Sequence, residues 1–167
     1  MNSLRLAALL GTLLMATSVT LAQEETKEKV ADPRIKATLD TLKYKYSVNK
    51  NKAYEVTFDL KDTKRSQVVF INSHTEKFSK MEIREVTSTA YKVKGKLSPE
   101  AAHLLLVDND KRKWGGWRIV EEGEFTYVIY AVQLPADAVP DTLSDAIDAA
   151  MYTADEMEKE VTAADNF

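Results

Sequence analysis

The chain has 167 residues, of which 44% are hydrophobic and 29% charged, with a formal net charge of -3 and no cysteine. This length fits one domain with a substantial core, and the composition excludes an intrinsically disordered chain. The lack of cysteine excludes disulfides, thiolate metal sites and a cysteine nucleophile. The acidic balance argues against nucleic-acid binding, which needs a net basic surface.

Residues 1–22 have the pattern of a secretory signal peptide. Arg5 precedes the uncharged, leucine-rich stretch Leu6–Ala22, and the small residues in 20–22 fit a cleavage site before Gln23. We therefore expect export to the periplasm or out of the cell. The alternative is an uncleaved membrane anchor, for which the stretch is short and diluted by small polar residues.

A flexible leader is predicted for residues 23–31, which are charged and polar, and the folded domain for residues 32–167. Asp32 followed by Pro33 predicts the start of a helix, because Asp accepts from free N–H groups and Pro needs no donor there. The apolar side of this helix consists of residues at helical spacing: Ile35, Leu39, Leu42 and Tyr46.

Three strands are predicted next. Residues 53–60 alternate between apolar and polar, which is typical of a strand with one wet face. Residues 65–72 contain the continuous apolar run Val68–Ile71, which indicates a strand covered on both faces or placed at an interface. Residues 81–93 are long and mixed, with a break near Ser88 that suggests a bulge.

A second helix and a hairpin follow. Ser98 and Pro99 predict the helix start by the same cap-then-proline logic. Residues 117–121 and 125–134 are predicted to be the two arms of the hairpin. The second arm is apolar on both faces, so we expect it to be central in the sheet.

The last predicted element is a long helix that begins with Asp141 as its cap and has one apolar stripe. Four aspartates follow helical spacing on its other side: Asp141, Asp145, Asp148 and Asp155. They are interpreted either as a solvated face or as a docking surface. The docking surface would receive a basic partner or the chain's own lysines, among them Lys50, Lys52, Lys92, Lys94 and Lys96.

The element order is therefore α-β-β-β-α-β-β-α. Five groups of residues carry a resemblance to a known family: Asp59, 65–70 (Arg-Ser-Gln-Val-Val-Phe), 115–118 (Gly-Gly-Trp-Arg), Leu134-Pro135, and 154–160 with Asp165 and Phe167. With these motifs the chain resembles the YbjN-type family, whose fold is similar to that of class I type III secretion chaperones.

The resemblance implies an α+β fold in which helices back an antiparallel sheet, usually in a homodimer. It implies no established enzymatic activity and no catalytic residues. One departure is the predicted export, because secretion chaperones act in the cytoplasm.

No catalytic or metal-binding pattern stands out. His74 and His103 lack a second ligand at a suitable spacing. Asp108 begins a sequence that resembles a calcium loop, but Lys113 replaces the required glycine. No nucleophile elbow or phosphate loop is present among five glycines. We therefore expect a protein that is not an enzyme and holds no cofactor or metal.

The function expected from these observations is an exported binding or regulatory module that recognises a protein or peptide, chaperone-like and homodimeric. Val69 and Ile71, with the apolar side of the second helix, are the predicted dimer surface. Trp114 is either a packing residue or an exposed binding aromatic. The strand at 81–93 is a candidate edge that pairs with an extended segment.

Two alternatives stay open. One is a periplasmic enzyme of the hydrolase class whose site is dispersed along the sequence. The other is a structural envelope protein tethered by an uncleaved Leu6–Ala22.

Overall fold

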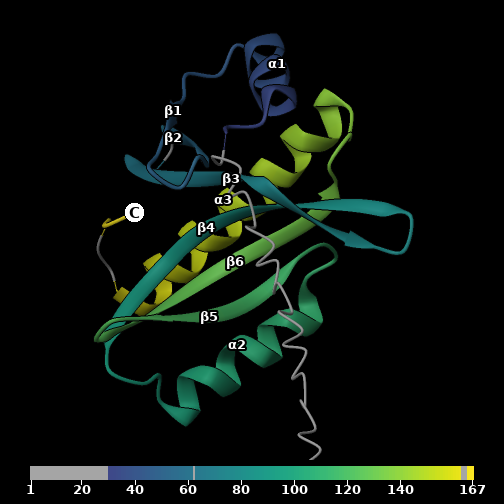
Figure 1. Cartoon of the computed structure of the whole chain (residues 1–167). Helices are drawn as coiled ribbons and strands as arrows, with labels where there is room; N and C mark the ends of the chain where they lie inside the picture. The colour runs from purple at the N-terminus through teal and green to yellow at the C-terminus, as the bar shows by residue number, and fades with distance from the viewer. Residues whose placement is uncertain (1–29, 62, 163–164) are drawn as a thin grey trace, which may run out of the picture.

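A computed structural model describes residues 30–61, 63–162 and 165–167. It confirms the α+β class, with one six-stranded antiparallel sheet and three helices (Figure 1). The elements are α1 (Pro33–Leu42), β1 (Ser47–Val48), β2 (Tyr54–Leu60), β3 (Arg65–Phe78), β4 (Met81–Lys94), α2 (Pro99–Lys111), β5 (Gly116–Glu122), β6 (Phe125–Pro135) and α3 (Pro140–Thr162). The predicted signal peptide, residues 1–22, lies outside the described residues. Within these ranges no helix is both long and apolar enough to cross a membrane.

The strands lie in the order β1-β2-β3-β4-β6-β5. β6 is an interior strand, as predicted for residues 125–134. β4 pairs with β3 on one side and β6 on the other, so the expectation of an edge strand at 81–93 is wrong. The sequence also gave no sign of the short β1, which pairs with β2 through two residues.

The first two helices begin where the sequence predicts. The Asp32 side chain accepts a hydrogen bond of 2.8 Å from the backbone N–H of Arg34. Ser98 caps α2 in the same way, accepting from Ala101 at 3.1 Å. Helix α3 starts at Pro140, so Asp141 lies in its first turn and is not the cap.

All three helices contribute to one hydrophobic core on a single face of the sheet, which we call the covered face. Helix α3 runs behind β4 and β6 in Figure 1. The core combines Ile35 of α1, Leu105 of α2 and Ile147 of α3 with the inward-facing residues of β2, β3, β4 and β6.

Val69 and Ile71 point into this core and are fully buried within the chain. Their proposed role as a dimer surface is therefore wrong. The run Val68–Ile71 is apolar throughout, but successive side chains of a strand point to opposite faces. Only Val68 and Phe70 of this run lie on the other side of the sheet, and both are half-buried.

The last turns of α3 are held to β3 by a buried ion cluster. Arg65 donates from Nε to Asp155 at 2.5 Å and from Nη2 to Glu158 at 2.8 Å. Asp155 is buried, so it does not belong to a solvated acidic face as predicted. Beyond the helix, the backbone N–H of Asn166 donates to Glu158 at 2.6 Å, which ties the chain end to the same cluster.

Candidate functional site

The face of the sheet opposite to the covered face receives none of the three helices, and we call it the open face. Cross-strand pairing determines which side chains it carries. One row crosses four strands in register and consists of Phe70, Thr87, Ala131 and Gly116. A second row runs beside it and contains Thr89, Ile129 and Arg118.

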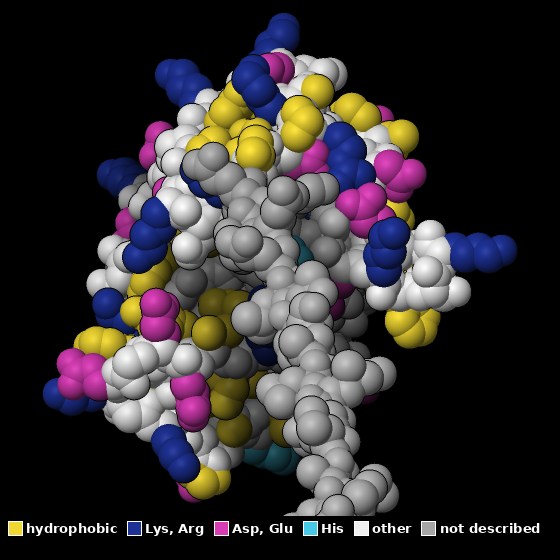
Figure 2. Space-filling model, in the orientation of Figure 1, with side chains coloured by type: hydrophobic (Ala, Val, Ile, Leu, Met, Phe, Trp, Pro, Cys, Tyr) yellow, Lys and Arg dark blue, Asp and Glu magenta, His cyan; other side chains and the backbone are white. Residues whose placement is uncertain are grey.

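The middle of the open face is apolar and only half-buried. Val68, Phe70 and Ile129 each retain access to solvent, whereas Val69 and Val128 on the other side of the same strands have none. In Figure 2, hydrophobic side chains (yellow) are visible in the middle of the molecule on this side. Contiguous apolar surface that a chain leaves uncovered commonly marks a binding site.

Two adjoining hollows lie on the open face and share Glu85 and Gln133. The first, of ≈ 400 Å³, is bordered by residues of β3 and β4, including Asn72, His74 and Ile83. The second, of ≈ 460 Å³, extends to β5. Because the two hollows share two residues, we treat them together as one groove.

A polar cluster separates the two halves of the groove. Arg118 of β5 donates two hydrogen bonds of 2.8 Å to the two carboxylate oxygens of Glu85 on β4. Gln133 of β6 adds a bond of 3.2 Å to Glu85. The bidentate arrangement fixes the carboxylate in place, although partial exposure of both partners limits what the pair contributes to stability.

Trp114 borders the β5 end of the groove. Its indole Nε1 donates to the carbonyl of Gln133 at 3.0 Å, and its own carbonyl accepts from the Tyr130 hydroxyl at 2.7 Å. Gly115 has a φ of +92°, and a Cβ there would lie 2.7 Å from the carbonyl oxygen of Ala131. The chain thus needs glycine to bring Trp114 against β6, and the half-buried indole both packs and lines the groove.

Trp117 has a different role. It is buried on the covered face, where its ring packs edge-on against Tyr130 with centroids 5.0 Å apart. Its indole donates to Asp108 of α2 at 2.7 Å. Asp108 also binds Arg112, so it takes part in a helix contact and not in a calcium loop.

The predicted acidic residues of α3 lie on the helix layer and not at the groove. Asp141 and Asp145 are exposed, and Asp148 is half-buried. Burial raises the pKa of Asp148, and the neighbouring Asp145 carboxylate adds to the effect. Among the residues that the structure describes, no ion pair joins these three to the five lysines named above.

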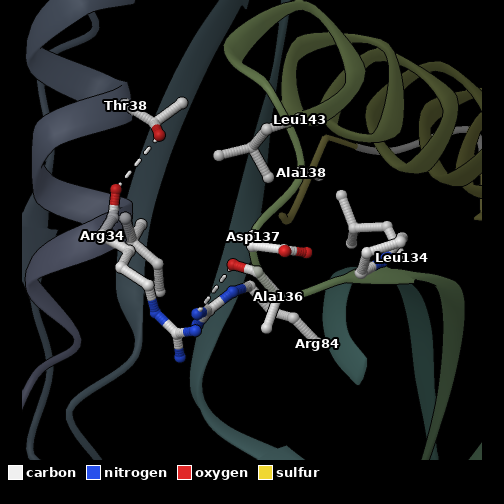
Figure 3. A pocket seen from close by; sticks show the side chains of 10 residues that line it. Arg34, Thr38, Arg84, Leu134, Ala136, Asp137, Ala138 and Leu143 are labelled. Carbon is white, nitrogen blue, oxygen red and sulfur yellow. Dashed lines mark hydrogen bonds between the residues drawn. The ribbon is translucent and has the colours of Figure 1, made fainter. Parts of the chain in front are cut away.

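A separate pocket, of ≈ 260 Å³, lies away from the groove, between α1, the end of β6 and the start of α3 (Figure 3). Buried Arg84 donates there to the carbonyl of Asn72 at 2.6 Å and to Asp32 at 2.6 Å. Arg34 also binds Asp32, at 2.7 Å, and binds Glu82 at 2.8 Å.

These charges around the separate pocket satisfy one another. Burial by itself would raise the pKa of Asp32, but hydrogen bonds from Arg34 and Arg84 outweigh it and hold that pKa well below its usual range. The Arg34 hydrogen bond lowers the pKa of Glu82 to about 2. Both carboxylates are therefore ionised partners of arginine and are unsuited to proton transfer near neutral pH.

The two histidines do not come together with other metal ligands. No group of three or more His, Asp or Glu side chains suited to a metal ion occurs within the described part of the chain. His74 borders the groove, and His103 is exposed on α2.

Sequence reasoning found Trp114 but missed Glu85, Arg118 and Gln133. Arg118 stood in the motif that carried the family resemblance, which was the available signal. Glu85 and Gln133 lie opposite each other only through the β4–β6 register, which a single sequence does not reveal.

A scan against protein-family models found no match, and a search of curated proteins found none either.

Proposed function

We propose that this protein is a non-enzymatic, chaperone-like binding or regulatory module that recognises a protein or peptide segment on its open face. The open face is the observation that carries this proposal: its apolar centre at Phe70 and Ile129 is only half-buried, and the groove with its polar cluster lies beside it. Burial of a partner's apolar side chains in the centre would supply affinity. The polar groups would set the orientation of the segment.

The partner would be held mainly through its side chains. Strand addition along residues 81–93 is not available, because both sides of β4 are already paired. A segment laid across the strands would instead place apolar side chains against Phe70 and Ile129. The amides of Asn72 and Gln133, which line the neighbouring groove, would accept or donate hydrogen bonds to the segment.

The experiment is a peptide-array screen with the protein in the form that cells export. Phe70→Ser and Ile129→Ser remove apolar surface from the centre of the open face. Tyr152→Ser is the matched control, because Tyr152 is an exposed aromatic of α3 in the helix layer. We expect these two open-face variants to lose binding to peptides that have spaced apolar residues, and the control to keep it. Equal binding by all variants would refute the proposed site.

The alternative function is a periplasmic hydrolase with a dispersed site. A hydrolase panel on the same preparation separates the two functions. Reproducible turnover that disappears in Phe70→Ser or Ile129→Ser would overturn the binding-module proposal.

The proposed homodimer would use α2 and the outer strand β5 in place of Val69 and Ile71. Large apolar side chains are exposed there: Leu104, Leu106, Val107 and Ile119. A second copy that covers this patch would remove it from water. Light scattering after size exclusion tests it, with Leu106→Glu expected to convert a dimer into a monomer. A wild-type monomer would refute the dimer.

Export is a further part of the proposal and is supported by the pattern of Leu6–Ala22. Cleavage would leave Gln23 as the first residue. The intact mass of the protein recovered from cells tests this expectation, and retention of residues 1–22 would favour the tethered alternative.

A further inference from the structure

The hairpin formed by β3 and β4 extends past the rest of the sheet as a two-stranded arm, which projects to the right in Figure 1. β6 pairs with β4 only as far as Ile83, which lies opposite Pro135. Beyond that point the two strands pair only with each other, and Phe78 opposite Met81 is the last pair. The first of these strands was predicted to end at residue 72, but it continues to Phe78, so the arm was not predicted.

The end of the arm is apolar and exposed. Phe78 has 68% of its surface exposed and Met81 has 52%, and as a directly opposed pair they point to the same side. Phe78 borders the outer end of the groove, but Met81 does not. The turn between them consists of Ser79, with a φ of +56°, and Lys80.

Two lysines flank this apolar pair. Lys77 and Lys80 are exposed, and neither has an ion-pair partner within 4.0 Å among the residues that the structure describes. The carboxylate of Glu82, which lies opposite Lys77, is bound by Arg34 and by the Thr75 hydroxyl. The nearest other acid on the arm, Glu76, lies two residues back from Phe78, about 7 Å at the rise of a strand.

We propose that Phe78 and Met81 insert into the headgroup layer of an anionic lipid bilayer, with Lys77 and Lys80 on lipid phosphates. This goes beyond the proposed function and does not depend on it. An interfacial segment buries apolar side chains about 5–10 Å deep, which matches the length of the arm beyond Glu76. Lysines at such a depth reach the phosphates with their ammonium groups while their stems stay in the apolar layer.

Charge complementarity favours a lipid over a protein as the occupant of the tip. The two lysines lie beside a small apolar tip made of Phe78 and Met81, whereas a stable complex with a protein needs a broad complementary surface. Each lysine near an anionic membrane surface adds to the attraction, and salt weakens it.

The experiment uses the chain with its native N-terminus, purified in the form that cells leave it. Vesicles of equal parts phosphatidylglycerol and phosphatidylcholine are compared with vesicles of phosphatidylcholine alone. Phe78→Trp places a fluorophore at the tip, and lipids brominated along their acyl chains quench it only if it inserts. We expect quenching beyond that of wild type in the anionic vesicles, and little in the neutral ones.

Paired variants separate the tip from the rest of the surface. Phe78→Ser combined with Met81→Ser should lower the partition coefficient about tenfold or more. Lys77→Glu combined with Lys80→Glu should lower it about tenfold at low salt. The controls are Val139→Ser, at an apolar residue 62% exposed, and Lys61→Glu with Lys64→Glu in the β2–β3 turn. We expect these controls to partition like wild type.

Three results would overturn the proposal. One is an unquenched tryptophan at position 78 in vesicles of either composition. Another is equal partitioning by the tip and control variants, which would assign any vesicle binding to another part of the chain. If Met81→Ser instead abolished peptide binding in the array while vesicles were ignored, the tip would be a protein contact.

Discussion

The two faces of the sheet carry side chains of the same strands but differ in how far those side chains are buried. On the covered face, Val69, Val86 and Val132 have no exposed surface, and α3 packs against the strands that carry them. On the open face, Phe70, Thr89 and Ile129 stand on the same three strands, yet none is fully buried. The backbone is shared, so the difference lies in what each row of side chains contacts.

Neighbouring residues of one strand thus have separate roles, one in stability and the next in the proposed recognition. The covered face holds the chain together, and its substitutions should be detected as loss of folding. The open face contributes little to the core, so its substitutions should leave a folded protein whose binding is changed. Substitutions on the two faces should therefore differ in their cost to stability.

The largest effect is expected from the ion pairs. Arg65→Ala leaves Asp155 and Glu158 buried without their cation, and it should lower the free energy of unfolding by about 3 kcal/mol or more. Arg118→Ala removes the half-exposed pair with Glu85 on the open face, and it should cost less than about 1 kcal/mol. Urea unfolding followed by circular dichroism measures both. Similar losses of stability at the two positions would contradict the expected difference between the covered and the open face.

Adjacent residues of β3 test the apolar part of the same contrast. Ile71→Ala creates a cavity under the helices and should cost about 3 kcal/mol. Phe70→Ala, one residue earlier, removes a larger side chain but should cost only about 1 kcal/mol, because Phe70 is half-buried and no helix covers it. Thermal unfolding of the two variants provides the measurement. A greater loss for Phe70→Ala would show that something covers the open face.

The dependence of stability on pH provides a further test. The pKa of Asp32 is lowered in the folded chain, so its contribution to stability is present above its ordinary pKa of 3.8 and is lost as the pH falls below it. Asn is as good a helix cap as Asp, so Asp32→Asn keeps the cap and removes the charge. We expect this variant to be less stable than wild type at neutral pH and the difference to shrink in acid.

Glu158 provides the opposite sign on the covered side. Burial raises its pKa, against hydrogen bonds from Asn166 and the charge of Arg65. Its contribution is therefore present below its ordinary pKa of 4.5 and is lost as the pH rises through the raised value. In Glu158→Gln that loss should be absent. Stability measured by urea at a series of pH values distinguishes the two variants, and parallel pH curves would contradict both assignments.

Local chemistry explains why much of the fold was predictable. The caps at Asp32 and Ser98 and the hairpin after Gly116 depend on neighbours within a few residues, and all three were found. The start of α3 was misplaced by two residues, because Asp141 is as plausible a cap as any in that stretch. β1 was missed because a two-residue strand has no periodicity of its own.

Long-range contacts explain what was not predictable. The spacing of Asp155 on α3 is that of a solvated helix face, and only Arg65, ninety residues earlier, accounts for its burial. Val69 and Ile71 belong to an apolar run whose two sides look alike in sequence. Which side the helices cover depends on the packing of α3, and no local pattern carries that information.

The position of α3 in the chain has a consequence for the timing of folding. Synthesis runs from the N-terminus, and α3 begins only at Pro140. Its residues Ile147, Ala150 and Met151 fill the core beneath the central strands. The nascent chain therefore cannot close its core until α3 has been made. An unclosed core is compatible with threading through a membrane channel, as the proposed export requires.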